Sequence, residues 1–215
     1  MKIAIFSESP TDEAALKILV EGILDEKIEE LPSPNRLQSR GSGVLRDVPI
    51  VLRGVYYNTE AGFLIIVRDS DDTPIHKKEH DEPNNEESAI CRYCELCKAT
   101  NNALGNLSSI PGKENFRVAI GVTVPAIEAW LLCDVNPHAS EATWINKQKE
   151  EGFNLYNDRR SLKAKLYGSH IASSETMIER GTESAKRLAE NIERLETLFP
   201  EGFGNMANEI RSWKK

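Results

Sequence analysis

Five consecutive apolar residues, FLIIV at positions 63–67, lead directly into Arg68 and then into three aspartates within four positions. A strand with one face in water alternates apolar and polar side chains, whereas a strand covered on both faces is apolar throughout. The run therefore predicts a central strand in a mostly parallel sheet, with helices packed against both faces. The fold class that this predicts is α/β.

The segments around this run predict how the chain is organised. Residues 2–6 and 116–124 are interpreted as strands, as is VPIVLRGVYY at 48–57, while residues 13–24 have helical spacing. Helical patterns dominate from about residue 143 to the end. We therefore expect an α/β domain over 1–135, with an insertion at 69–110 that forms a lid or a zinc segment. A helical C-terminal extension over 136–215 is expected to pack on that domain.

Composition narrows the class of protein. The chain has 215 residues, 40% hydrophobic and 28% charged, which is ordinary for a soluble domain. Its net charge of −7 argues against a wholly basic nucleic-acid coat but leaves room for a locally basic groove. The apolar stretch at the start is too short for a signal peptide, and no run suits a membrane span. Cysteines crowded at 91–97 do not resemble a secreted disulfide framework, so we expect a cytoplasmic protein with reduced thiols.

Acidic residues follow three of the predicted strands. Glu8 comes after the first strand with Asp12 four positions on, Asp69 and Asp71 follow the central strand, and Glu128 opens a helix after the last. The carboxyl ends of parallel strands share one edge of a sheet, where ligands bind. Clustered carboxylates repel one another unless a cation lies between them, and oxygen ligands suit Mg²⁺ or Mn²⁺. The pattern predicts a divalent-metal site, although any one of these motifs alone also fits a turn or helix cap.

The order of these motifs resembles the TOPRIM fold, the metal-binding domain of primases, type II and IA topoisomerases and OLD-type nucleases. The similarity is greatest to small bacterial TOPRIM-like proteins of unknown function. Their first motif reads roughly E-G-x-T-E/D-E and their third contains E-A-W-L; here SESPTDEAAL and VPAIEAWLLCD occupy those places. The ending GFGNMANEIRSW is also similar, so the resemblance covers most of the chain.

The resemblance implies roles for individual residues. It implies that Glu8 acts as a general acid or base and that Asp69 and Asp71 hold Mg²⁺, with Asp12 as a further ligand in the nuclease branch. Glu128 matches the glutamate of the third motif. One position departs from the pattern, because serine at position 9 replaces the glycine that usually follows the first glutamate.

The function implied is a metal-dependent nuclease acting on DNA or RNA, in bacterial defence with a separate ATPase partner. This chain has no G-x-x-x-x-G-K-[ST] motif of its own. Two alternatives remain open. The departure at position 9 suits a catalytically inactive binding or regulatory subunit. Asp69-x-Asp71-x-Thr73 also resembles the first motif of haloacid-dehalogenase phosphatases, with Asp69 as nucleophile.

A second candidate metal site lies between the central strand and the next. The paired spacings His-x-x-x-His and Cys-x-x-Cys are typical of zinc ligands. The alternative is that the cysteines lie on the buried face of a helix. The candidate zinc ligands are His76, His80, Cys91, Cys94 and Cys97.

Basic residues near the predicted metal site are candidates for contacting phosphates. Arg159, Arg160 and Lys163 lie within one turn of a predicted helix, and Arg53 and Arg68 lie near predicted strand ends. The alternative for the helical group is an ordinary solvated face. The sequence does not distinguish DNA from RNA or predict an oligomeric state.

Overall fold

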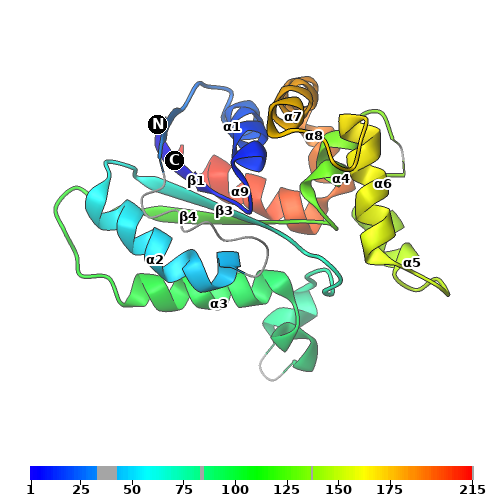
Figure 1. The fold of residues 1–215 in the computed structure, drawn as a ribbon. Helices are drawn as coiled ribbons and strands as arrows, with labels where there is room; N and C mark the ends of the chain where they lie inside the picture. The colour runs from blue at the N-terminus through cyan, green and yellow to red at the C-terminus, as the bar shows by residue number, and fades with distance from the viewer. Residues whose placement is uncertain (33–42, 83–84, 137, 215) are drawn as a thin grey trace.

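The computed structural model describes residues 1–32, 43–82, 85–136 and 138–214. Four parallel strands form one sheet in the order β2-β1-β3-β4 (Figure 1). They are β1 (Lys2–Phe6), β2 (Glu29–Leu31), β3 (Phe63–Asp69) and β4 (Arg117–Thr123). The α/β prediction is confirmed, and the apolar run at 63–67 is an interior strand of the sheet.

Alternate side chains of β3 enter two separate cores. Leu64 and Ile66 pack with residues of α2 (Gly43–Asn58) and α3 (Arg92–Gly105). Ile65 and Val67 pack instead with α1 (Pro10–Leu24) and the C-terminal helices. Successive side chains of a strand point to opposite faces, so an uninterrupted apolar run is what two covered faces require.

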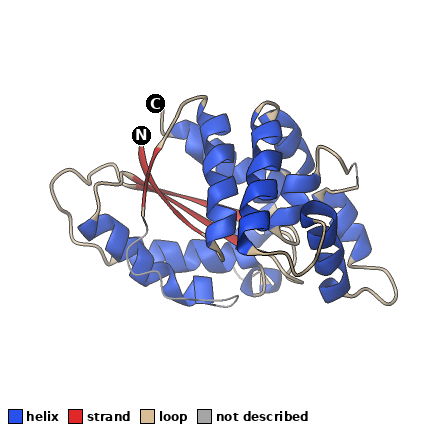
Figure 2. Cartoon of the chain, turned by 45° about the horizontal axis from the view of Figure 1, so that its top comes forward, coloured by secondary structure: helices blue, strands red, loops and turns tan. Residues whose placement is uncertain are grey.

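Helices form a layer on each side of the sheet. Figure 1 shows α2 and α3 on one side and α1, α7 (Ser174–Ala189) and α9 (Asn205–Ser212) on the other. The strands lie between these layers when the molecule is turned (Figure 2). This is the arrangement of an open α/β sheet, whose strand ends at one edge are left free for a ligand.

The prediction of a strand at 48–57 is wrong, because this segment is part of the helix α2. Its dense Val, Ile and Tyr content favours a strand. The buried members, however, are Val48, Val51, Leu52, Val55 and Tyr56, which is helical spacing. The segment 32–43, PSPNRLQSRGSG, is rich in Pro, Ser and Gly, which predicts a polar loop. It falls mostly on residues outside the described part of the chain.

The helices beyond residue 136 share one core with α1 and the sheet. They follow α4 (Ile127–Leu132), and Trp130 of α4 meets Phe203 edge to face at 5.0 Å. The bounds of the remaining elements are α5 (Glu141–Lys147), α6 (Leu155–Tyr167), α8 (Ile192–Leu198) and a π-helical turn, η3 (Pro200–Gly204).

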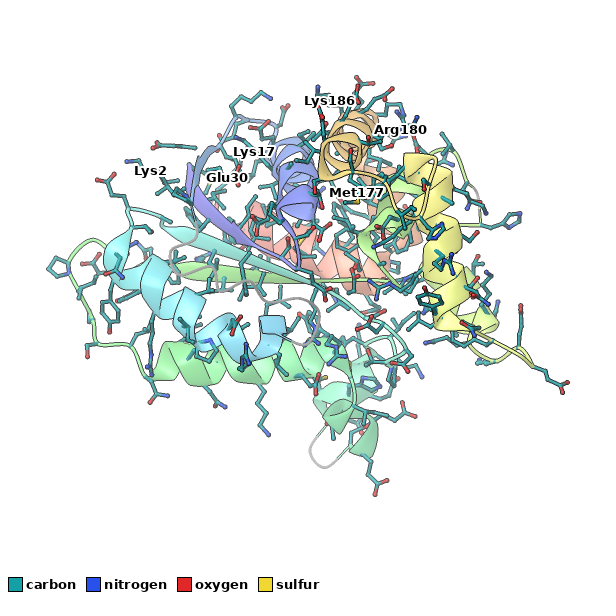
Figure 3. All side chains as sticks on the ribbon, viewed as in Figure 1. Lys2, Lys17, Glu30, Met177, Arg180 and Lys186 are labelled. Carbon is teal, nitrogen blue, oxygen red and sulfur yellow. The ribbon has the colours of Figure 1, made fainter. Side chains whose placement is uncertain are left out.

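Two shorter features complete the fold. The connection from β3 to α3 contains the 3₁₀ turns η1 (Lys78–Asp81) and η2 (Glu86–Ala89). The edge strand β2 is held beside α1, where Lys17 lies 3.5 Å from Glu30 (Figure 3). Among the described residues, we find no helix with both the length and the apolar character needed to cross a membrane.

Candidate functional site: an acidic pocket at the strand ends

A pocket of about 220 Å³ opens beside the carboxyl ends of β1 and β3. Met177 of α7, labelled in Figure 3, forms part of its wall. Four of the five acidic residues predicted as the metal site line it, together with two basic residues and a tyrosine. These charged and phenolic residues are Glu8, Asp12, Asp69, Glu128, Arg159, Lys163 and Tyr167.

Parallel register explains why acids distant in sequence meet. Phe6 pairs with Ile66, and Asp69 pairs with Thr123, so the chain leaves β1, β3 and β4 on the same side. Glu8 then stands in the turn after β1, and Asp12 lies in the first turn of α1. Glu128 is the second residue of α4 and is buried. The sequence-based expectation of one shared edge agrees with this placement.

Asp69 is a buried carboxylate of the pocket lining. Its Oδ1 accepts a hydrogen bond from the Thr123 hydroxyl at 2.5 Å, and its Oδ2 accepts one from the Arg159 guanidinium. Burial raises its pKa, while the positive charge of Arg159 opposes that rise. Both oxygens of Asp69 therefore already accept a hydrogen bond.

Asp71 lies at the mouth of the pocket rather than in its lining. Its backbone adopts the left-handed conformation, with φ of 54°, which aspartate tolerates better than most residues. Its carboxylate accepts a hydrogen bond from Arg159 and lies 3.9 Å from the Arg92 guanidinium. One arginine thus connects both acids of the Asp-x-Asp motif. Asp72, beside them, is an exposed turn residue.

Glu8 has an unusual environment for a surface-loop glutamate. Its Oε1 is buried without a hydrogen-bond partner and lies 3.7 Å from Nε of Arg68. Burial, followed by the charges of Asp69 and Asp71, raises the pKa of Glu8 to about 7. The charges of Arg159 and Arg68 oppose this rise only in part. A carboxyl group with a pKa near neutrality can both accept and donate a proton.

The other two carboxyls of the pocket also resist ionisation. Burial, followed by the charge of Asp69, raises the pKa of Asp12 to about 8. The same two causes raise the pKa of Glu128, and Lys163 at 3.9 Å opposes them. Carboxylates that raise one another's pKa in this way gain from a shared cation.

Ser9 occupies its position without any need for glycine. Its φ is −147°, an extended conformation open to any residue, and its side chain caps α1 by accepting from the Asp12 backbone N–H at 3.2 Å. Serine is among the preferred N-cap residues. Serine in place of the glycine of the motif that this segment resembles is therefore compatible with the local backbone.

The predicted basic residues separate into two groups. Arg159 and Lys163 line the pocket, and Arg68 lies buried behind Glu8. Arg160 points elsewhere, since its Nη2 lies 2.6 Å from Nε2 of His170 and its guanidinium covers the Tyr156 ring. Arg53 is an exposed residue of α2. The prediction that it lies near a strand end is wrong, because the segment 48–57 is helical.

Two residues near the acids were not predicted from the sequence. Tyr167 enters the pocket from the end of α6, and burial together with the charge of Glu128 raises its pKa. Arg92 is the first residue of α3 and reaches Asp71. The sequence carried no clear signal for either, because α3 and α6 approach β3 only in the folded chain.

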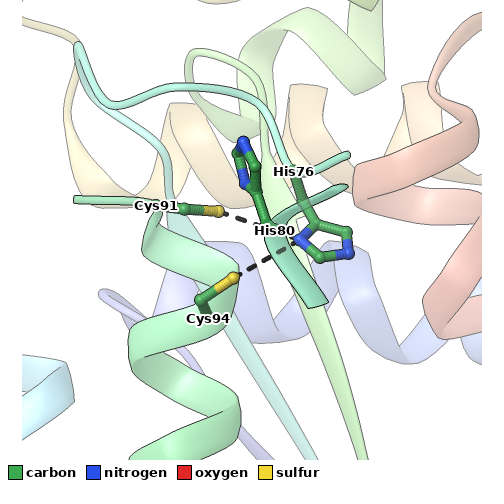
Figure 4. A group of neighbouring side chains, drawn as sticks. All are labelled: His76, His80, Cys91 and Cys94. Carbon is green, nitrogen blue, oxygen red and sulfur yellow. Dashed lines mark hydrogen bonds between the residues drawn. The ribbon is translucent and has the colours of Figure 1, made fainter. Parts of the chain in front are cut away.

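The second candidate metal site is a separate cluster. Its ligand atoms, from His76, His80, Cys91 and Cys94, all lie within 4.8 Å of one another (Figure 4). Cys97, the fifth predicted ligand, is not part of this group and interacts with Tyr93. Four of the five predicted ligands are thus brought together.

Comparison of the chain with protein-family models, with curated proteins and with solved structures gave no match. The geometry of the two sites is therefore the basis for proposing a function.

Proposed function

We propose that the protein is a metal-dependent, TOPRIM-like nuclease that cleaves phosphodiester bonds in DNA or RNA at the acidic pocket. The observation that supports this most is the convergence of four carboxylates, from the ends of β1 and β3 and the starts of α1 and α4, on one pocket that also contains Arg159 and Lys163. The acidic groups could bind a cation while the neighbouring basic groups bind a phosphate.

The donor set fits a hard divalent cation. Every acidic group offers oxygen, the ligand that Mg²⁺ and Mn²⁺ prefer. Oε1 of Glu8 is buried without a hydrogen-bond partner, and burial followed by the charge of Asp69 raises the pKa of Asp12, so a nearby cation would stabilise both groups as carboxylates. Asp69, Asp71, Asp12 and Glu128 would hold the ion. When bound, it would supply charge neutralisation at the phosphate and an activated water.

The chain's own residues supply the remaining functions. Glu8 has a pKa of about 7, so it would move a proton to or from the water or the leaving oxygen near neutral pH. Arg159 and Lys163 would bind phosphate oxygens, for which guanidinium and ammonium groups are well suited. To do so, Arg159 must turn away from Asp69 and Asp71 when the metal and the substrate arrive.

The cellular setting is part of the proposal. The four cysteines, at positions 91, 94, 97 and 133, are all free, which suits a reducing cytoplasm. A role in bacterial defence with a separate ATPase partner rests on the resemblance to TOPRIM-like proteins alone.

Cleavage of a substrate panel tests the activity. Supercoiled plasmid, linear duplex, single-stranded DNA and total RNA are each incubated with Mg²⁺, Mn²⁺ or EDTA. The proposal predicts metal-dependent cleavage that is lost in Glu8→Gln and in Asp69→Asn. Asp72→Asn is the matched control, because it makes the same change on the exposed turn beside the motif and retains activity. Cleavage that persists in EDTA, or in both pocket variants, contradicts the proposal.

The inactive binding subunit is the second candidate, and one observation favours it. Arg159 neutralises Asp69 and Asp71 directly, as a permanent internal substitute for the metal would. On that account the protein binds nucleic acid without cleaving it, and EDTA does not change the affinity. The haloacid-dehalogenase alternative is weaker, since both oxygens of its nucleophile Asp69 are engaged by Thr123 and Arg159.

A further inference from the structure

We propose that His76, His80, Cys91 and Cys94 form a structural zinc site that closes the connection between β3 and α3. The set is two imidazoles and two thiols, which is a common composition of four-coordinate structural zinc sites. The four ligand atoms lie within 4.8 Å of one another. The site is separate from the acidic pocket and does not depend on the nuclease proposal.

Burial separates this cluster from a chance surface grouping. His76, His80 and Cys91 are buried, with exposed fractions of 8%, 4% and 0%. Nδ1 of His76 lies 3.5 Å from Sγ of Cys94 and 3.9 Å from Sγ of Cys91 (Figure 4). Nδ1 of His80 is buried with no hydrogen-bond partner. A buried imidazole nitrogen without a partner is costly, and a metal bond would satisfy it.

A carboxylate outside the cluster orients the imidazole of His80, because Nε2 of His80 lies 3.2 Å from Oε2 of Glu87. Oδ2 of Asp81 lies 3.8 Å from Nε2 of His76, which is beyond hydrogen-bond distance. A proton held on Nε2 of His80 by Glu87 leaves the Nδ1 lone pair of that ring free for an ion. Ligand histidines in metalloproteins commonly donate their other nitrogen to a carboxylate in this way.

The ligands come from two short segments of the chain. His76 precedes η1 and His80 lies in it, whereas Cys91 is the N-cap residue of α3 and Cys94 lies one turn later. The described residues of the connection between them, 81–82 and 85–90, include no buried side chain. An ion bound to both would hold this segment in place, as small metal-stabilised folds do.

Zinc would also fix the start of α3, and with it Arg92, next in the chain after Cys91. The Arg92 guanidinium lies 3.9 Å from Asp71, at the mouth of the acidic pocket. Zinc therefore supports the geometry of that mouth from a distance, without contacting the substrate.

The test measures bound metal rather than activity. The full chain is purified without chelator and analysed for zinc, and the zinc is then exchanged for Co²⁺ to record its absorption spectrum. We expect about one equivalent of zinc per chain and the intense charge-transfer bands of cobalt bound to thiolates. Zinc far below one equivalent, in protein that also fails to take up added Zn²⁺ or Co²⁺, would overturn the proposal.

Cysteine and histidine variants identify the ligands. Cys94→Ser and His80→Gln are expected to lose most of the bound zinc. Cys97→Ser is the matched control, because this residue lies on the same helix one turn further along, outside the cluster, and the variant should retain full zinc content. Equal loss of zinc from Cys97→Ser and Cys94→Ser would contradict the assignment. Should Cys94→Ser fail to fold, the wild-type cobalt spectrum and the His80→Gln variant still decide.

Discussion

Arg159 of α6 and Asp69 at the end of β3, 90 positions apart in the chain, form an ion pair in the wall of the acidic pocket. The same guanidinium also donates to Asp71. Under the proposed function, this arginine pairs with the same two carboxylates that would bind the divalent ion. Arginine and metal would then compete for Asp69 and Asp71.

Removal of that arginine should destabilise the metal-free protein and make it more responsive to metal. Arg159→Ala leaves the buried Asp69 without its charged partner, which typically costs about 3–5 kcal/mol of unfolding free energy. Saturating Mg²⁺ should restore a large part of the loss. Urea unfolding with and without Mg²⁺ measures both effects. Arg160→Ala, on the same helix but turned toward His170, is the control and should change stability by less than about 0.5 kcal/mol. A loss in Arg159→Ala that Mg²⁺ leaves untouched would argue against a shared site.

The identity of residue 9 should matter for helix capping and not for phosphate approach. Ser9→Ala removes the side-chain acceptor for the Asp12 N–H and should cost about 1 kcal/mol, whereas Ser9→Gly should cost only a few tenths. Because the backbone of Ser9 is extended, introducing the glycine of the resembled motif should leave the cleavage rate within about twofold. Parallel unfolding and cleavage assays check this. A large gain in cleavage by Ser9→Gly would show that serine does limit access to the pocket.

Glu141 should give the protein a measurable dependence of stability on pH. This glutamate is buried, and its carboxylate accepts the backbone N–H groups of Glu201 and Gly202. Burial nevertheless raises its pKa to about 7 from the usual 4.5. Between these two values the folded state holds a proton that the unfolded state has lost, so this group's contribution to stability is full below pH 4.5 and declines as pH rises to about 7.

The decline should amount to about 3 kcal/mol of unfolding free energy from this one group. Glu141→Gln removes the titration. The stability difference between wild type and variant, measured by urea unfolding at several pH values, should fall with rising pH in that window and stay level above it. A stability difference that stays constant within measurement error from about pH 4 to pH 8 would contradict the raised pKa of Glu141.

Gly202 should not tolerate a side chain. A Cβ there would lie 2.1 Å from the Val122 carbonyl oxygen of β4 and 3.0 Å from Oε1 of Glu141. Since backbone atoms cannot move aside cheaply, Gly202→Ala should cost at least about 3 kcal/mol of unfolding free energy. Gly105→Ala is the control, because a Cβ at that position meets nothing within 4 Å. Thermal unfolding of the two variants compares them, and equal midpoints would contradict the close approach of η3 to β4.

Local pattern was enough to group the acids and to name Arg159 and Lys163 as basic candidates, but not to find every partner. FLIIV marked β3, and acids after parallel strands had to share an edge, so Glu8, Asp69 and Glu128 could be grouped from sequence. Arg92 could not, because its place beside Asp71 depends on how α3 packs against the sheet.

Two elements show where pattern fails. The segment 48–57 has the composition of a strand, yet its apolar residues follow helical spacing, and tertiary packing decided in favour of α2. The edge strand β2 has three residues and no apolar run, so nothing distinguished it from a loop.

The histidine and cysteine spacings identified both halves of the cluster formed by His76, His80, Cys91 and Cys94. They could not separate Cys97 from the other two cysteines, since Cys91, Cys94 and Cys97 recur at intervals of three along the chain. Only the direction of each side chain on α3 makes that distinction.

Direct binding of Mn²⁺ tests the central claim that the acidic pocket is a metal site. Electron paramagnetic resonance follows free Mn²⁺ as zinc-loaded protein is titrated, so the thiol cluster is already filled. We predict saturable binding to the wild type, retention in Asp72→Asn, and a loss of at least about tenfold in affinity for Asp69→Asn. Equal binding by wild type and Asp69→Asn, or no binding by either, would contradict it.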